Sequence, residues 1–311
     1  SVKNEGFDWW GYSAGRECPL DRIEYIDYGT DPAAWLAAAE ADEVDCFYEN
    51  VGEYVDVMEG IGWENSEIAT GSTILIRPNQ TTPDADGNTV YADKRVRQAL
   101  AMAVDNNICL ELGYANKGAP ADNHHAGSMH PEHDPSVGRL PYDPAKAKAL
   151  MAEAGMADYE HELISIDDDW RKNTTDAVAA QLRDAGIKVK RTILPGSTFW
   201  NDWAKYPFSS TNWNHRPFAV QVWGLAYRSG EAWNEMGWSN AEFDALLAEA
   251  NSIADADKRR AVAGKCQALI AEEGCTIQPY WRSLYRSHSS STVCDMHIAY
   301  HAHVYKWGFK A

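Results

Sequence analysis

The sequence lacks an apolar run of the roughly 18 residues that a helix needs to span a bilayer. Its first eight residues also lack the basic and then apolar pattern of a signal peptide. We therefore expect either that a signal has been removed or that the chain begins partway through a longer one. Positive charge is scarce as well, since 28 Lys and Arg stand against 46 Asp and Glu for a formal net charge of −18. Proteins that bind nucleic acid gather positive charge against phosphates, so this balance argues against nucleic acid as a partner.

The common short motifs of enzymes are absent too. The sequence has no G-x-S-x-G nucleophile elbow, no G-x-x-x-x-G-K-[ST] phosphate loop, no G-x-G-x-x-G and no H-E-x-x-H. The acidic run at 167–169 precedes a predicted helix, where it would stabilise the helix dipole. We therefore expect no catalytic residues and no cofactor, and the protein is not predicted to be an enzyme.

Cysteine and histidine give no clear metal signature. The six cysteines include no C-x-x-C pair, and fifteen complete disulfide pairings stay open. Histidines gather in a Pro- and Gly-rich loop and near the C-terminus: His124, His125, His130 and His133, then His297, His301 and His303. Zinc and nickel sites need imidazoles fixed on rigid elements, which such a loop offers poorly. We expect no metal site, and metal binding through the His-rich loop is the less favoured alternative.

Apolar periodicity and turn residues predict alternating helices and strands. Helices are expected at about 32–39, 93–104, 143–155, 170–185, 239–250 and 257–273. Strands are expected at 22–27, 44–48, 73–77, 160–166, 187–194, 218–225, 276–281 and 298–306. The helix at 170–185 joins two strands that should be parallel, and a capping box at Ser239 and Glu242 should open the next helix. The predicted fold class is α/β.

Four stretches, in chain order, resemble the extracytoplasmic solute-binding proteins of dipeptide, oligopeptide and nickel ABC importers (family 5). They are F-D-W-W-G at 7–11 with D-R-I-E-Y at 21–25, D-K-R-V-R-Q-A-L-A-M-A-V-D at 93–105, Y-D-P-A-K-A-K-A-L-M-A-E-A-G at 142–155, and W-G at 223–224 with S-N-A-E-F-D at 239–244. Most of their residues have ordinary scaffold roles, so the fold follows from them more safely than the ligand does.

The resemblance implies a two-lobed clamp of the periplasmic-binding-protein type II kind, with the second lobe nearly complete and a remnant of the first. Residues 1–77 and 275–311 would belong to the first lobe and 78–274 to the second, with hinges near Pro78 and Cys275–Pro279. Strands left at the edge of an incomplete first lobe would expose an apolar face.

The implied function is the substrate-binding component of an ABC importer. Such a protein captures a small, peptide-like solute in the periplasm, outside the cytoplasmic membrane, and passes it to a membrane permease. The alternative from another class is a sensor or interaction protein that reuses the fold.

The candidate binding residues flank the strand expected at 218–225, because ligands in open α/β sheets bind at the carboxyl ends of strands. Thirteen Trp and fifteen Tyr supply flat contacts with few rotamers to freeze, and Arg side chains can grip a carboxylate with two bonds. The predicted set is Trp213, Asn214, Arg216, Trp223, Tyr227, Arg228, Trp233 and Asn234.

One departure from the family bears on the ligand class. Peptide-binding members carry an aspartate three residues after a Trp, where it pairs with the ammonium group of the peptide. The resemblance places Ala226 at that position, with Arg228 nearby and Glu231 one alternative alignment away. We therefore expect a preference for an anionic or neutral group over a free amino terminus.

Overall fold

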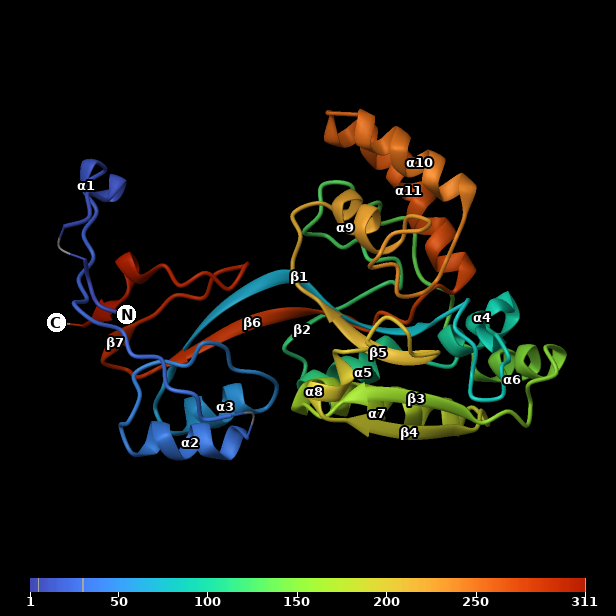
Figure 1. Ribbon diagram of the computed structural model, residues 1–311, viewed down its shortest axis with the longest axis horizontal. Coiled ribbons are helices and arrows are strands. Elements are labelled where there is room, and N and C mark those ends of the chain that lie inside the picture. Colours follow the sequence, from blue (N-terminus) through green and yellow to red (C-terminus); the bar gives the residue numbers. More distant parts are fainter. Residues whose placement is uncertain (5, 30, 311) are drawn as a thin grey trace. The chain divides into compact units, whose positions relative to one another are not determined.

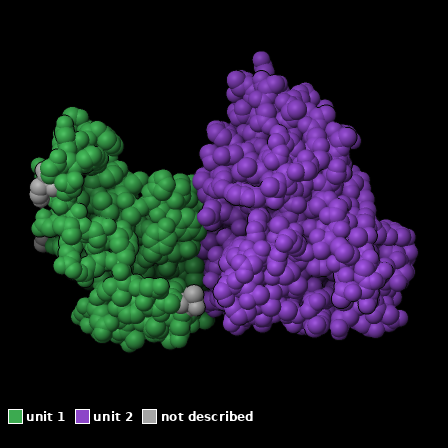
Figure 2. Space-filling model, viewed as in Figure 1, with its two compact units in different colours: residues 1–70, 283–311 green, residues 71–282 purple. Residues whose placement is uncertain are grey.

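The computed structural model describes residues 1–4, 6–29 and 31–310. The chain divides into two compact units, which Figure 2 colours separately. Unit 1 combines residues 1–70 with 283–311, and unit 2 is the continuous stretch 71–282. Among the described residues, no helix has both the length and the apolar content that crossing a membrane requires.

A six-stranded mixed sheet supplies the frame of unit 2, in the order β2-β6-β1-β5-β3-β4. Strands β3 and β4 are parallel and are joined by helix α7, which confirms the predicted β-α-β unit. Strand β1 is antiparallel to β5, with Thr73 opposite Trp213. The strands are β1 (Glu64–Pro78), β2 (Gly118–Pro120), β3 (His161–Ile166), β4 (Val189–Leu194), β5 (Phe208–Trp213) and β6 (Tyr280–His288), and α7 is Asp169–Asp184.

Helices cover both faces of this sheet, as Figure 1 shows. On one face, Leu75 of β1 and Trp213 of β5 pack in a buried apolar cluster with helices α9, α10 and α11. On the other face, α7 meets the sheet through hydroxyls: Thr175 donates to Ser210 of β5 at 2.8 Å. The α9–α11 helices span Ala219–Ala226, Ala241–Ser252 and Ala256–Glu273, and α5 (Asn106–Tyr114) packs against α7.

Aspartate side chains begin several helices of unit 2 at the predicted places. Asp93 accepts a hydrogen bond from the Arg95 N–H at the start of α4 (Lys94–Met102). Asp143 and Asp255 do the same for α6 (Pro144–Glu153) and α11. These caps satisfy backbone donors that a helix leaves free, so a local sequence signal suffices to predict them. The expected Ser239 cap is wrong by one residue, because Asn240 accepts the bond from the Phe243 N–H.

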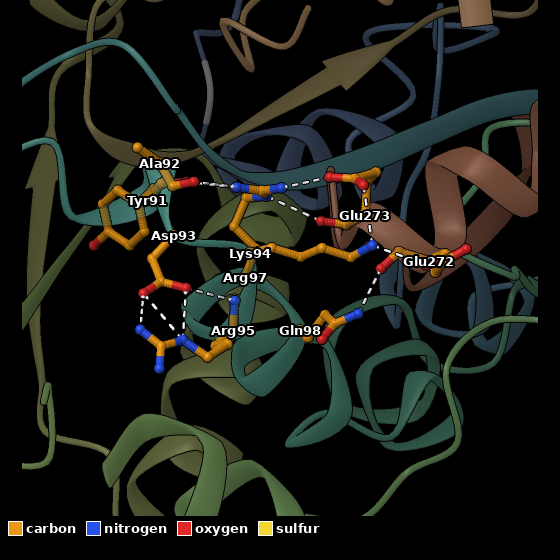
Figure 3. Close-up of polar contacts among 9 residues, drawn as sticks. All are labelled: Tyr91, Ala92, Asp93, Lys94, Arg95, Arg97, Gln98, Glu272 and Glu273. Carbon is orange, nitrogen blue, oxygen red and sulfur yellow. Dashed lines mark hydrogen bonds and ion pairs between the residues drawn. The ribbon is translucent and has the colours of Figure 1, made fainter. Parts of the chain in front are cut away.

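The family-like stretch at 93–105 has a scaffold role (Figure 3). Arg97 is buried and donates to the backbone carbonyls of Tyr91 and Ala92 at 3.0 and 2.9 Å. Its guanidinium also binds the carbonyl and the carboxylate of Glu273, the last residue of α11, at 2.9 and 2.8 Å. Gly274 then turns the chain with a φ of 63°, and a Cβ there would lie 2.9 Å from the Arg97 carbonyl carbon. The arginine thus joins the start of α4 to the end of α11.

Five predicted strands are wrong, reduced or shifted. Residues 218–225 form helix α9, because a short apolar run fits a buried helix as well as a buried strand. Residues 298–306 contain only the three-residue helix η2 (Val304–Lys306) and no strand. Two further stretches, 22–27 and 44–48, form only isolated β-bridges, which join Arg22 to Val2 and Cys46 to His288. The alternation of apolar and polar residues predicts an extended segment, but a strand also needs a neighbouring strand to pair with. The strand expected at 276–281 begins later, as β6.

Helices α2 (Pro32–Glu40) and α3 (Tyr54–Gly60) of unit 1 pack around a small aromatic core. Phe47 stacks on Trp63 at 5.2 Å, and Met58 and Ala39 complete the buried cluster. A groove of about 510 Å³ runs along the same unit, where Tyr25, Ile26 and Phe309 are more than half exposed. The elements are α1 (Trp10–Ser13), α2 (Pro32–Glu40), α3 (Tyr54–Gly60), β7 (Thr292–Val293), η2 and β8 (Gly308–Phe309), and β1 and β6 each give residues to both units.

The two units divide at 70/71 and 282/283, whereas the sequence prediction placed the boundaries at 77/78 and 274/275. The first shift lies inside strand β1, and the second covers the segment after α11 and the first residues of β6. Residues 73–78 of β1 pair with β5, so they belong with the sheet of unit 2. The assignment of the two units to the first and second lobes remains a proposal.

Two cysteines of unit 1 should form a disulfide under oxidising conditions. Cys46 and Cys294 are free thiols that both line the groove, and the neighbouring Cys46 thiol lowers the pKa of Cys294. A lower pKa favours the attacking thiolate. We expect glutathione disulfide to oxidise this pair and to release two glutathione molecules. Peptide mapping of the alkylated product should find the 46–294 link, and Cys46→Ser should abolish it. Another pairing, or six thiols still reactive after denaturation, would contradict this.

Candidate ligand-binding site

A surface hollow of about 230 Å³ lies at the carboxyl end of strand β5 in unit 2. Four predicted residues line it, together with two strand residues and two tryptophans that follow helix α8 (Gly196–Phe199). The lining consists of Trp213, Asn214, Arg216 and Trp233 from the predicted set, and Thr211, Asn212, Trp200 and Trp203 besides. The hollow lies at the carboxyl end of β5, whereas the sequence prediction placed the binding residues around a strand at 218–225.

The walls of the hollow are aromatic and partly open to solvent. Trp213 is buried and meets Trp233 edge to face, with ring centroids 5.8 Å apart. Trp233 and Trp200 are 46% and 43% exposed, which leaves indole surface free to contact a ligand. Exposed rings of this size are costly in water, and they suit stacking against apolar or planar groups.

Of the eight lining residues only Arg216 carries a charge. Its guanidinium donates to the carbonyl of His215 at 3.1 Å, and this bond holds the side chain close to its own loop. Asn212 is fixed from the α7 side, where Arg171 donates to its Oδ1 at 2.9 Å. The hollow therefore combines apolar walls with one cation and amide groups, a set suited to a small molecule with an anionic or polar end.

A buried ion pair lies under the aromatic walls. The Arg77 Nε and the Glu235 Oε2 are 2.7 Å apart, and both side chains are fully buried. Glu235 also accepts from Thr211 Oγ1 at 2.7 Å and from the Trp213 indole N–H at 2.8 Å. Arg77 donates in turn to the carbonyl oxygen of Trp203. The pair therefore fixes two of the tryptophans that line the hollow.

Burial pulls the pKa of Arg77 down from its usual value, while Glu235 opposes that shift. Sequence reasoning missed both residues. Arg77 ends a run of buried apolar residues in β1, and a charge in such a place is the one local signal that a buried partner exists. Nothing local identifies Glu235 as that partner.

The other predicted residues lie outside the hollow. Helix α9 buries Trp223 in the apolar cluster, where its indole N–H donates to the His124 carbonyl at 3.0 Å. Tyr227 is buried as well, with its hydroxyl 3.1 Å from His125 Nδ1. Asn234 donates to the carbonyls of Arg228 and Trp238 at 3.0 and 2.7 Å, which closes the loop after α9. Arg228 is exposed and is ion-paired with Glu231.

The His-rich loop is packed rather than loose. His124, His125 and His130 are buried, and the ring nitrogens of His124 face the Val137 carbonyl at 3.1 Å and the Ala126 N–H at 3.4 Å. Asp122, His124 and His133 bring possible metal-binding atoms within 4.8 Å of one another. Because backbone groups already occupy both nitrogens of His124, this group has a structural explanation.

Comparison with known proteins identifies the family. Residues 2–234 match the family described as bacterial extracellular solute-binding proteins, family 5 Middle, so the chain belongs to this family. Oligopeptide-binding protein AppA of Bacillus subtilis is 26% identical over 83% of this chain and 50% of its own. Di/tripeptide-binding protein 3 of Pseudomonas aeruginosa is 26% identical over 66% of this chain and 40% of its own.

Solved structures agree on the fold. The structure of AppA from B. subtilis with a nonapeptide matches 91% of this chain and 59% of that chain, with a TM-score of 0.78 and 19% identity. NikZ from Campylobacter jejuni with Ni(L-His) matches 91% of this chain and 61% of that chain, with a TM-score of 0.78 and 17% identity. The fold is therefore mixed α/β of the periplasmic-binding-protein type II kind. A third relative is heme-binding protein A of Haemophilus influenzae. The chain spans about 35–50% of the length of these three curated relatives.

Proposed function

We propose that this protein is the substrate-binding component of an ABC importer and that it captures a small peptide-like solute. It would act outside the cytoplasmic membrane and deliver its ligand to a membrane permease. Membership of the solute-binding family supports the general role. The relatives named for oligopeptides and for di- and tripeptides support the ligand class.

The aromatic hollow carries the proposal that the ligand binds in unit 2. Trp233 and Trp200 would contact apolar side chains of the ligand, and Arg216 would bind an anionic group such as a terminal carboxylate. This role was expected for Arg228 too, but Arg228 already pairs with Glu231 and does not line the hollow. Arg216 is therefore the better candidate for anion recognition.

The test begins with a thermal-shift screen of a di- and tripeptide library, followed by calorimetry on the best ligand. Trp233→Ala should raise its Kd about tenfold or more, because an exposed aromatic contact is lost. Trp10→Ala in unit 1 is a matched control, since Trp10 is even more exposed and lies outside the hollow. Equal Kd values for Trp233→Ala and the parent protein would contradict binding in the hollow.

Arg216 gives a separate readout of ligand chemistry. The parent protein should prefer a peptide with a free terminal carboxylate over its carboxamide by about tenfold, and Arg216→Ala should remove that preference. Acetylation of the amino terminus should leave binding intact. A ligand that needs its free ammonium, or a preference that survives Arg216→Ala, would contradict anion recognition by this residue.

A further inference from the structure

Three histidines of the C-terminal segment come together in unit 1. His297, His301 and His303 follow strand β7 in a loop, and one ligand atom of each lies within 4.8 Å of the others. The His297 ring is stacked on that of His301 at 4.8 Å and meets that of His303 at 4.4 Å. His301 is exposed and the other two are half-buried, so an ion can reach all three from solvent.

The surroundings of these rings do not explain the cluster as ordinary packing. His303 Nδ1 is buried and has no hydrogen-bond partner among the described residues. The nearest acid is Asp295, whose Oδ2 is 3.9 Å from that nitrogen. The Ala299 N–H donates to His297 Nδ1 at 3.1 Å, a bond that a metal bound through this nitrogen would replace. Buried imidazole nitrogens normally find partners, and the polar group near this one is the Asp295 carboxylate at 3.9 Å, so hydrogen bonding among the described residues of the loop does not account for the position of His303.

An aspartate lies beside one ring of the cluster, with its Oδ2 3.9 Å from His303 Nδ1. Asp295 is held by the Trp307 indole N–H at 2.9 Å and lies 3.4 Å from Lys306 Nζ. A carboxylate placed beside one ring nitrogen orients the other toward a metal, as is usual around histidine ligands.

We propose that His297, His301 and His303 bind one divalent transition-metal ion of the zinc and nickel class, with Asp295 orienting His303. Imidazole ligands suit these ions, whereas calcium and magnesium require oxygen. Nitrogens around a tetrahedral zinc ion are about 3.3 Å apart, so ligand atoms that lie within 4.8 Å of one another have to approach by up to roughly 1.5 Å. Rotation of the exposed His301 side chain would contribute to that contraction.

The bound ion would stiffen a loop that already contacts residues 48 and 49. The Tyr300 hydroxyl donates to Glu49 at 3.2 Å, and the Tyr48 hydroxyl donates to the Tyr300 carbonyl at 3.2 Å. Metal binding would therefore fasten the C-terminal segment to the N-terminal part of unit 1. This site is independent of the proposed peptide hollow, whose lining belongs to unit 2.

The test uses an untagged chain stripped with a chelator and then titrated with Zn²⁺ or Ni²⁺ by calorimetry. We expect one ion per chain, a rise of a few degrees in the thermal midpoint, and no response to Mg²⁺. His301→Ala should weaken binding at least tenfold while leaving the metal-free midpoint unchanged, because the side chain is exposed. His133→Ala is the matched control from the other histidine group and should bind like the parent.

Two results would overturn the proposal. One is the absence of stoichiometric Zn²⁺ or Ni²⁺ binding to the untagged chain. The other is binding that survives His301→Ala and is lost in His133→Ala, which would move the site to the Asp122, His124 and His133 group. Neither measurement involves a peptide, so its outcome is separate from that of the proposed function.

Discussion

Replacing Glu235 with alanine is expected to lower the free energy of unfolding by about 3–5 kcal/mol, the range for breaking one side of a buried ion pair. The variant leaves the Arg77 guanidinium charged and fully buried without its carboxylate. It also removes the acceptor for Thr211 Oγ1 and for the Trp213 indole N–H. Each lost buried partner adds a desolvation cost, so several penalties combine at one position.

Urea unfolding followed by circular dichroism measures this loss. Glu242→Ala is a suitable control, because Glu242 is an exposed acid in helix α10 and should change stability by less than about 0.5 kcal/mol. The double variant Arg77→Met/Glu235→Leu should recover part of the loss, since removing both charges leaves none unpaired. A loss below about 1 kcal/mol for Glu235→Ala would show that the pair is not the buried support inferred here.

The helical scaffold of unit 2 could be predicted because its signals are local. Asp93, Asp143 and Asp255 begin three helices, and each lies within three residues of the N–H it caps. The parallel β3-α7-β4 unit follows from two strand-like runs joined by one long amphipathic helix. Such signals need no knowledge of what packs against them.

The parts that failed depend on partners far away in the sequence. Whether residues 218–225 form a strand or a helix depends on the apolar cluster in which they are buried. Because they form helix α9, Trp223 and Tyr227 lie in the core and not on the expected binding face. Trp213 and Arg216 line a surface hollow because Trp213 is the last residue of strand β5 and Arg216 lies in the loop that follows it. Arg77 and Glu235 are 158 residues apart, so no local pattern predicts their contact.

Acid should begin to destabilise unit 2 at a pH above that at which most carboxylates are titrated, because buried histidines must be protonated. Burial lowers the pKa of His124, His130 and His161 to about 4, from 6.5 for a solvated imidazole. His125 is shifted in the same direction by burial and by neighbouring positive charge. In the unfolded chain these rings regain ordinary values, so the unfolded state binds more protons between pH 6.5 and about 4.

Because the unfolded state binds more protons, the free energy of unfolding falls as the pH is lowered. Stability from these histidines is complete above pH 6.5 and falls as the pH drops toward 4, because each neutral ring must be exposed before it can be protonated. At pH 5 each of the three rings with a pKa of about 4 costs on the order of 2 kcal/mol. Together they approach the whole stability of an ordinary domain, so we expect unfolding at a midpoint between about pH 4 and 5.5.

The variant His161→Gln measures how much one buried histidine contributes to the loss of stability in acid. The ring of His161 is buried beside the Tyr91 hydroxyl, 3.1 Å from Nδ1, and glutamine keeps a hydrogen-bonding group there without a titrating one. The readout is the difference in unfolding free energy between pH 7.5 and pH 5, which should shrink by about 2 kcal/mol in the variant even if its stability at pH 7.5 falls. His301→Gln, at an exposed ring, should leave the difference as in the parent when metal is absent. An unchanged difference in His161→Gln would mean that this imidazole is protonated in the folded protein, which would require a water-filled path to a side chain that the structure shows fully buried.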